Sequence, residues 1–155
     1  MLQHSRADPR CQCTRPATSF RTGRIGYGRI MLDPTGRTIM ISGANRGLGN
    51  AIARQLHDDG YNISVGGRDI DALRRSMDGY DPARLLCHRY DATQPGTDAE
   101  WVDATIERFG SLSGLVNNAG IIETAELEAL TEDALDAMWS VNVKAPFRMI
   151  RLALP

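Results

Sequence analysis

Residues 42–49, Ser-Gly-Ala-Asn-Arg-Gly-Leu-Gly, decide the fold of this 155-residue chain, because they join an apolar segment to a helical one through three glycines. The preceding run 38–41, Thr-Ile-Met-Ile, is typical of a buried parallel strand. The following residues 51–53 and Leu56 have the spacing of a helix with one apolar stripe. We therefore predict a strand, a tight glycine turn and a helix in succession.

A turn of this kind directs unpaired backbone N–H groups and the positive end of the helix dipole at whatever lies above it, and such a site binds anions such as pyrophosphate. A side chain at Gly43 or Gly47 would obstruct the turn or the ligand, and one at Gly49 would push the helix off the sheet. The spacing is G-x-x-x-G-x-G, not the G-x-G-x-x-G of dinucleotide-binding folds generally. A merely tight turn is the alternative, and the rest of the chain decides against it.

Three further motifs follow the glycine turn in order. Asp91 stands just past the apolar segment 85–89, Asn117-Asn118-Ala119-Gly120 follows another apolar pair, and Asn142 lies in a late helical segment. Together these four elements resemble the short-chain dehydrogenase/reductase family, whose first strand ends in T-G-x-x-x-G-x-G. Ser42 replaces the usual threonine and keeps its hydroxyl. The resemblance covers residues from about Arg37 to the end of the chain.

The resemblance and the alternation of apolar and helical segments imply an α/β fold, a Rossmann-type doubly wound parallel sheet. A βαβ unit takes about 30 residues, so about four strands are expected, in the order 3-2-1-4. The expected strands end at residues 42, 65, 89 and 117, and the expected helices span residues 47–59, 70–77, 97–109 and 131–154. On the helix 97–109 we expect one apolar face made of Ala99, Val102, Ile106 and Phe109.

Residues 1–36 differ from the rest of the chain in composition and charge. They contain six arginines against two aspartates, a net +4, whereas residues 37–155 carry −5. This segment lacks apolar periodicity and the h-region of a secretory signal, so we expect a disordered or poorly ordered extension before a domain at 37–155. Its arginines leave a transit peptide or a nucleic-acid-binding arm as alternatives. The negative charge of residues 37–155 argues against nucleic acid as a partner.

The remaining composition excludes several classes of protein. No unbroken apolar stretch approaches the roughly 20 residues that a membrane helix needs, so no membrane partner is expected. Cys11, Cys13 and Cys87 have no second cluster to complete a metal site, and their odd number is typical of free thiols in a reducing compartment. We therefore expect no metal and a cytoplasmic location.

The resemblance implies a nicotinamide dinucleotide as cofactor and assigns roles to particular residues. Those lining the pyrophosphate and adenosine ribose would be Gly43, Ala44, Asn45, Arg46, Gly47, Leu48 and Gly49. Asp91 and Ala92 would lie against the adenine, with the carboxylate accepting from the exocyclic amine; a solvated turn aspartate is the alternative. Asn118, Ala119 and Gly120 would pass under the nicotinamide ribose, and Asn117 would brace the strand ends.

Asn142 is the one catalytic residue that the resemblance places in this chain. Pro146, four residues later, has no N–H, so the Asn142 carbonyl loses its helical partner and could hold an ordered water. In the resembling family an asparagine here takes part in a proton relay through such a water. A helix asparagine beside a packing kink is the alternative.

The choice of cofactor is expected to be decided just past the second strand, at Gly67, Arg68 and Asp69. An acid there binds the ribose 2′-OH of NAD, whereas an arginine accommodates the 2′-phosphate of NADP. In the resembling family the acid of NAD users falls where Gly67 stands, and a basic or hydroxyl residue of NADP users falls at Arg68, so the resemblance implies that NADP(H) is favoured over NAD(H). Asp69 could take the role of the acid if the strand ended one or two residues later than residue 65.

The family interconverts carbonyls and alcohols of small-molecule substrates by hydride transfer, with a Tyr-x-x-x-Lys pair as acid/base. The only lysine, Lys144, is preceded four residues earlier by Ser140, so these 155 residues lack the pair. We expect the chain to be an inactive, cofactor-binding front half of such an oxidoreductase, with a homo-oligomer as the complete protein. The alternative is a non-catalytic dinucleotide-binding module.

Overall fold

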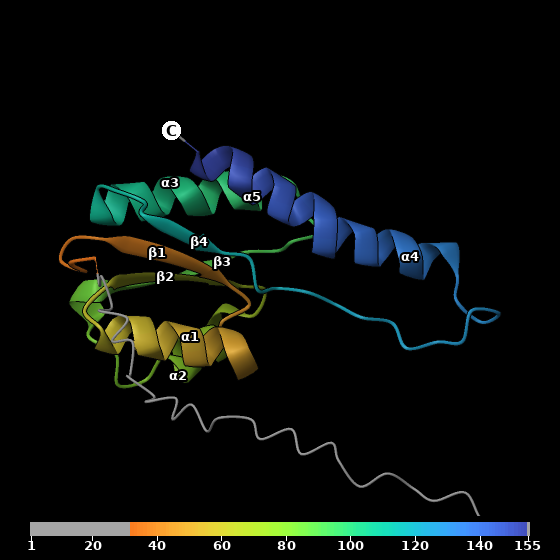
Figure 1. Cartoon of the computed structure of the whole chain (residues 1–155), viewed down its shortest axis with the longest axis horizontal. Helices are drawn as coiled ribbons and strands as arrows, with labels where there is room; N and C mark the ends of the chain where they lie inside the picture. Colours follow the sequence, from red (N-terminus) through yellow and green to blue (C-terminus); the bar gives the residue numbers. More distant parts are fainter. Residues whose placement is uncertain (1–31, 155) are drawn as a thin grey trace, which may run out of the picture. The chain divides into compact units, whose positions relative to one another are not determined.

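Four parallel strands form the centre of the fold, and the computed structural model describes them within residues 32–154 (Figure 1). The strands are β1 (Thr38–Ser42), β2 (Asn62–Gly67), β3 (Leu85–Arg89) and β4 (Gly114–Val116), in the order β3-β2-β1-β4. In the register, Ile39 of β1 lies opposite Ile63 of β2 and Gly114 of β4. The predicted parallel sheet and its strand order are confirmed. Most of the extension predicted at residues 1–36 lies outside the described residues.

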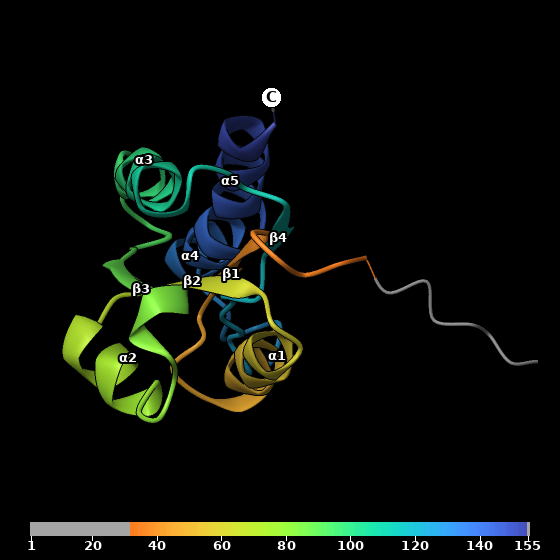
Figure 2. The same ribbon diagram turned by 90° about the vertical axis from the view of Figure 1, so that its left-hand side faces the viewer.

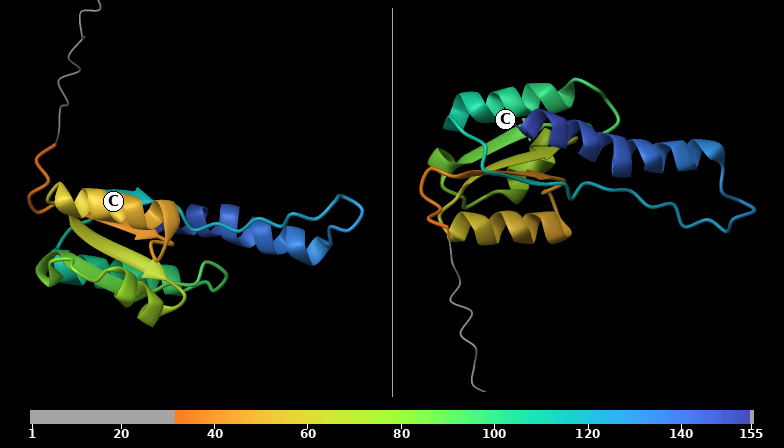
Figure 3. Two further views of the ribbon diagram at one scale, coloured as in Figure 1. Left: turned by 90° about the horizontal axis from the view of Figure 1, so that it is seen from below. Right: turned by 45° about the horizontal axis from the view of Figure 1, so that its top comes forward.

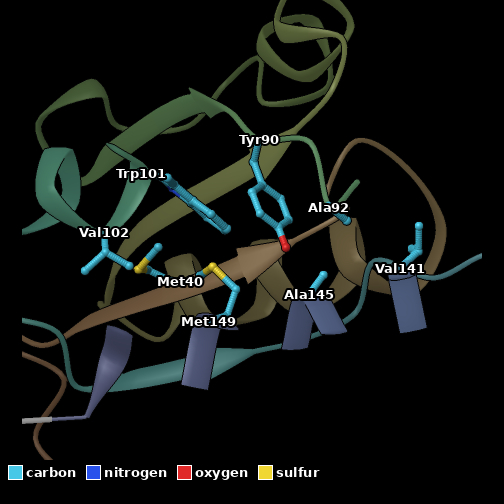
Figure 4. Packing of buried hydrophobic residues seen from close by; sticks show 8 residues of the cluster. All are labelled: Met40, Tyr90, Ala92, Trp101, Val102, Val141, Ala145 and Met149. Atoms are coloured by element: carbon cyan, nitrogen blue, oxygen red, sulfur yellow. The ribbon is translucent and has the colours of Figure 1, made fainter. Parts of the chain in front are cut away.

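Helices cover both faces of this sheet. Figure 2, seen along the strands, shows α1 (Gly47–Asp58) and α2 (Ile70–Ser76) on one face and α3 (Thr97–Phe109) and α5 (Ala145–Ala153) on the other. Successive strand residues point to opposite faces, so Met40 and Ile41 of β1 enter different hydrophobic clusters. The cluster under α3 and α5, drawn in Figure 4, consists of Met40, Tyr90, Ala92, Trp101, Val102, Val141, Ala145 and Met149.

The buried face of α3 differs from the predicted apolar stripe. Trp101 and Thr105 are fully buried, whereas Ile106 is 41% exposed. The Trp101 Nε1–H donates to Ser64 Oγ on β2 at 2.9 Å, and that oxygen lies 2.8 Å from Thr105 Oγ1. Counting apolar residues overlooked this face because its polar atoms find partners inside the protein, which removes the cost of burying them.

The late helix is interrupted where the sequence predicted one continuous helix with a kink. It consists of α4 (Glu132–Trp139), a π-helical turn (Ser140–Lys144) and α5, which Figure 3 shows as one helical segment. The Thr131 hydroxyl accepts the Ala134 N–H at 3.2 Å and so caps the N-terminus of α4. Pro146 lies in the first turn of α5, where its missing N–H is tolerated. The wider π turn lies directly before α5. Turns of this kind are frequent at functional sites.

Within residues 32–154, no helix has the length and apolar character needed to cross a membrane.

Candidate functional site

A cleft of about 690 Å³ lies at the carboxyl ends of the strands. In doubly wound sheets this edge is where ligands bind. Its lining consists of Gly43, Asn45, Arg46, Gly47, Leu48, Gly66, Gly67, Arg68, Asp69, Tyr90, Asp91, Ala92, Thr93, Asn118, Ala119, Gly120, Ile121, Ala137 and Val141. The structure thus brings together all the predicted cofactor-binding residues except Ala44 and Gly49, which are buried next to this lining.

The turn after β1 needs glycine at two positions because of its backbone conformation. Gly43 has φ +67° and Gly47 has φ +58°, in the left-handed region that other residues rarely adopt. The Gly43 N–H donates to the Gly66 carbonyl at 2.8 Å, so the turn is fastened to the end of β2. A Cβ at Gly43 would lie 3.0 Å from the Ala119 Cα. The turn therefore leaves no room for a side chain between the loops after β1 and β4.

Gly49 is required for a different reason from the one predicted. A Cβ there would lie 2.4 Å from Asn118 Nδ2 and 2.6 Å from the Gly43 carbonyl oxygen. The close approach is therefore between α1 and the loops that follow β1 and β4, rather than between α1 and the face of the sheet.

A reciprocal set of hydrogen bonds joins the ends of β1 and β4. Ser42 Oγ accepts the backbone N–H groups of Asn118 and Ala119, each at 3.0 Å. Asn118 Nδ2 donates in return to the carbonyls of Ser42 and Gly43, each at 3.0 Å. Bracing was predicted for Asn117, and that prediction is wrong. β4 ends at Val116, one residue earlier than predicted, and Asn117 is exposed.

The N-terminus of α1 is open to an anion. Its cap residue, Arg46, is extended and makes no side-chain hydrogen bond to the helix, and the first turn contains no acidic residue. The first N–H groups of a helix have no partner within it, and the helix dipole adds positive potential there. Arg46 and Leu48 line the cleft beside this end of α1. The geometry therefore suits a phosphate group.

Asp91 and Ala92 form part of the opposite wall, in the loop after β3. Asp91 Oδ1 accepts from the Thr93 N–H at 2.9 Å and from the Thr93 hydroxyl at 2.7 Å. Burial opposes ionisation of Asp91, but the Thr93 hydrogen bonds and the nearby Arg68 and Arg89 outweigh it and lower the pKa of this carboxyl. Asp91 is therefore a carboxylate at neutral pH.

Tyr90 gives the cleft an aromatic wall that the sequence did not predict. Its ring packs on Trp101 with the centroids 5.0 Å apart, and burial raises the pKa of Tyr90 to about 12. The phenol is therefore neutral at physiological pH. Figure 4 shows Tyr90 above Met40 and Ala145, in the cluster that supports the cleft.

The end of β2 places both candidate specificity residues in the cleft. The strand runs to Gly67, two residues beyond the predicted end, and Arg68 and Asp69 follow it, so the condition under which Asp69 could take the role of the acid is met. Asp69 Oδ1 caps α2 by accepting the N–H groups of Asp71 and Ala72, at 3.1 and 2.9 Å. One oxygen of Asp69 is therefore engaged by the protein, while Arg68 is exposed.

Asn142 lies in the π turn and reaches the cleft through the backbone. Its Oδ1 accepts the Ile121 N–H at 2.9 Å and its Nδ2 donates to the Ile121 carbonyl at 2.7 Å. Ile121 lines the cleft directly after Gly120. Asn142 thus holds the loop after β4; that its carbonyl holds a water stays a prediction.

Other groups in the described part of the chain suggest no second chemistry. No group of three or more His, Cys, Asp or Glu residues within residues 32–154 could hold a metal ion. Cys87 is a free thiol, and burial raises its pKa; Cys11 and Cys13 lie outside the described residues. Thr93, Gly66 and Ile121 also line the cleft and were not predicted; their signal in the sequence is only that they lie within about five residues of the end of a strand.

Comparison with known proteins agrees with this geometry. The family model for short chain dehydrogenase matches residues 37–155. The chain is 42% identical over 118 residues to an agropine synthesis reductase of Rhizobium rhizogenes, covering 76% of this chain and 27% of the reductase.

Two solved structures are similar over the same region. One is a short-chain dehydrogenase/reductase, glucose/ribitol dehydrogenase, from Brucella melitensis, with a TM-score of 0.75 and 29% identity over 77% of this chain and 49% of that one. The other is a short chain dehydrogenase from Burkholderia cenocepacia in complex with NADP, with a TM-score of 0.73 and 31% identity over 79% of this chain and 51% of that one. The chain thus spans about half or less of the length of these relatives. With the sheet order, the glycine turn and the family match in agreement, the chain belongs to the short-chain dehydrogenase family of oxidoreductases.

Proposed function

We propose that this chain is the dinucleotide-binding part of an NAD(P)-dependent oxidoreductase that interconverts a carbonyl and an alcohol by hydride transfer. The observation that carries the proposal is the cleft itself. It lies at the carboxyl ends of the strands, and the uncapped N-terminus of α1 and the glycine turn form one of its walls. An anionic ligand with an extended apolar and aromatic body suits such a lining.

In this proposal residues 43–49 hold the pyrophosphate, because their backbone leaves room for it beside the free N–H groups of α1. Asp91 and Ala92 take the adenine, because the Asp91 oxygen that does not bind Thr93 is left to accept from the exocyclic amine. Asn118, Ala119 and Gly120 take the nicotinamide ribose. Asn142 supports that end through Ile121.

NADP(H) is the favoured cofactor in this proposal. Arg68 and Arg46 both line the cleft and both offer positive charge to a 2′-phosphate. Asp69, the competing acid, already caps α2 with one oxygen. The similar Burkholderia cenocepacia structure in complex with NADP supports the same choice.

Hydride transfer needs a proton donor and acceptor for the substrate oxygen, and these 155 residues contain no Tyr-x-x-x-Lys pair. We therefore propose that they bind the cofactor without turnover, and that substrate binding and homo-oligomer formation belong to the complete protein. A non-catalytic dinucleotide-binding module is the second candidate, favoured by the same missing pair. Reading the gene beyond codon 155 separates them, because a Tyr-x-x-x-Lys in frame is expected only for the enzyme.

Isothermal titration of the 155-residue chain with NADP+ and with NAD+ tests the proposal. We expect both to bind and NADP+ to bind at least about tenfold more tightly, as one charge-assisted contact to a phosphate provides. Replacing the cleft arginine, Arg68→Ala, is expected to remove most of that preference.

The control is Arg75→Ala, because Arg75 is an exposed arginine of α2 outside the cleft lining. It is expected to leave the preference unchanged. Tighter binding of NAD+ than of NADP+ would overturn the cofactor choice. No binding of either at millimolar concentration would overturn the proposed function.

A further inference from the structure

A largely buried ion pair joins α5 to the beginning of α3. Arg148 Nε lies 2.5 Å from Asp98 Oδ2, and Asp98 is only 3% exposed. The same guanidinium uses Nη2 to donate to the Ala92 carbonyl at 2.8 Å. Arg148 therefore contacts both the first turn of α3 and the loop that precedes it.

Asp98 is bonded on both oxygens. Its Oδ1 accepts the N–H groups of Gly96 and Ala99, at 2.8 and 3.1 Å, while Oδ2 accepts from Arg148. Burial opposes ionisation of this carboxyl, but Arg148 and the two N–H groups outweigh it and lower its pKa. The carboxylate thus ties the end of the loop 90–96 to the guanidinium.

This loop carries the wall of the cleft nearest to Arg148. Tyr90, Asp91, Ala92 and Thr93 all line the cleft, whereas Arg148 does not. Thr97 Oγ1 holds the loop from inside by donating to the Asp91 carbonyl at 3.0 Å. Among the side-chain hydrogen bonds of residues 32–154, the one from Arg148 to the Ala92 carbonyl reaches the loop from a helix other than α3.

We propose that Arg148 is a positioning residue for the adenine end of the cofactor: held by Asp98, it fixes the Ala92 carbonyl and thereby the Asp91 carboxylate that reads the exocyclic amine. The inference rests on the proposed function, because it presupposes that a dinucleotide occupies the cleft. Arg148 touches no ligand in this arrangement and acts through the loop alone.

Arg148 can position Asp91 because of where the hydrogen bonds of the loop lie. The Asp91 side chain is oriented by Thr93, which is two residues away in the same loop, so both side chains move together if the loop shifts. The bond at Ala92 lies between them. Losing it frees the peptide between the adenine-reading carboxylate and the residue that orients it.

A purely structural ion pair makes a different prediction. Loss of such an ion pair would lower the stability of the fold and would weaken the binding of every ligand of the cleft by a similar factor. A positioning residue instead changes how well the site distinguishes ligands that differ at the adenine. The distinguishing readout is therefore a ratio of affinities and not an affinity.

The experiment compares NADP+ with nicotinamide hypoxanthine dinucleotide phosphate, which carries a carbonyl oxygen on C6 of the purine in place of the exocyclic amine. Both are titrated calorimetrically into the full 155-residue chain and its variants. The unmodified chain is expected to prefer NADP+ by about tenfold, the value of one hydrogen bond to a charged group. In Arg148→Gln that preference is expected to fall to within about twofold, while affinity for the hypoxanthine analogue changes by less than about threefold.

Three further variants complete the experiment. Arg148→Lys keeps the charge and is expected to recover part of the preference. Asp98→Asn keeps an oxygen for Gly96 and Ala99 but loses the ionic partner, so it replaces Arg148→Gln if that variant does not fold. Arg151→Gln, at an exposed arginine of the same helix, is expected to behave like the unmodified chain.

The outcomes are distinct. An unchanged preference in Arg148→Gln and Asp98→Asn, or a parallel loss for both ligands, overturns the inference. Equal binding of the two dinucleotides by the unmodified chain also overturns it, because Asp91 then does not read the amine, yet the proposed function stands. Binding of neither ligand by the unmodified chain overturns the proposed function and the inference with it.

Discussion

At the scale of single residues, the site depends on close approach between two loops that lie about 75 residues apart in the sequence. Ser42 and Asn118 exchange hydrogen bonds through both their backbone and their side chains, and Gly49 lies against that bonded pair. The glycines and both asparagines could be predicted as a group from their motifs. Which of the two asparagines braces the strands could not be predicted, because it depends on the last residue of β4. A run of apolar residues does not determine where a strand ends to the residue.

Gly49→Ala is expected to destabilise the chain by about 1–3 kcal/mol, the usual cost of overpacking a well-packed site. The added Cβ would meet Asn118 Nδ2 and the Gly43 carbonyl, and neither is a flexible side-chain end free to move away. Urea denaturation measures the change. Gly67→Ala is the control, since its Cβ would lie 3.7 Å from Leu73, an ordinary contact. Equal stability of the two variants would contradict this account of the turn.

At the scale of elements, the apolar runs, the glycine turn and the helical spacing predicted most of the helices and strands. The bounds of β3 and α3 agree with the prediction to the residue. The buried face of α3 and the π turn could not be predicted in this way. The buried face of α3 depends on a hydrogen-bond partner, Ser64, that lies on β2. The π turn is a change in the spacing of backbone hydrogen bonds, which does not alter the periodicity of apolar residues.

His57 links the end of α1 to the segment before β3, and this contact makes the stability depend on pH. Its Nε2 accepts the Asp81 N–H at 3.1 Å, which only the neutral ring can do. Burial and the nearby Arg84 lower the pKa of His57 below its ordinary value of 6.5. On acidification the unfolded chain therefore takes up this proton first. The contribution is complete above about pH 6.5 and is lost as the pH falls through the folded-state pKa.

The free energy of unfolding is accordingly expected to fall between pH 7.5 and pH 5.5, and the fall is expected to be smaller in His57→Gln. Chemical denaturation at both pH values measures it. His88→Gln is the matched control, because His88 lies in a half-buried position of β3 outside this contact. An equal pH dependence in His57→Gln and in the unmodified chain would show that another group is responsible.

At the scale of the whole described domain, one helical segment supports two walls of the cleft. Asn142 in the π turn binds the backbone of Ile121, and Arg148 in α5 binds the backbone of Ala92. The sheet order could be predicted from the alternation of strands and helices. The pairing of Arg148 with Asp98 could not, because the two residues are 50 positions apart and neither belongs to a motif.

The central claim is that a dinucleotide lies in this cleft with its phosphates at the N-terminus of α1. The most direct test is an amide-resolved NMR titration of the ¹⁵N-labelled chain with NADP+. The account predicts that the largest shifts occur at residues 43–49, 91–93 and 118–121, while the outer faces of α2 and α3 stay unchanged. Shifts concentrated away from these three loops, or none at millimolar NADP+, would contradict it.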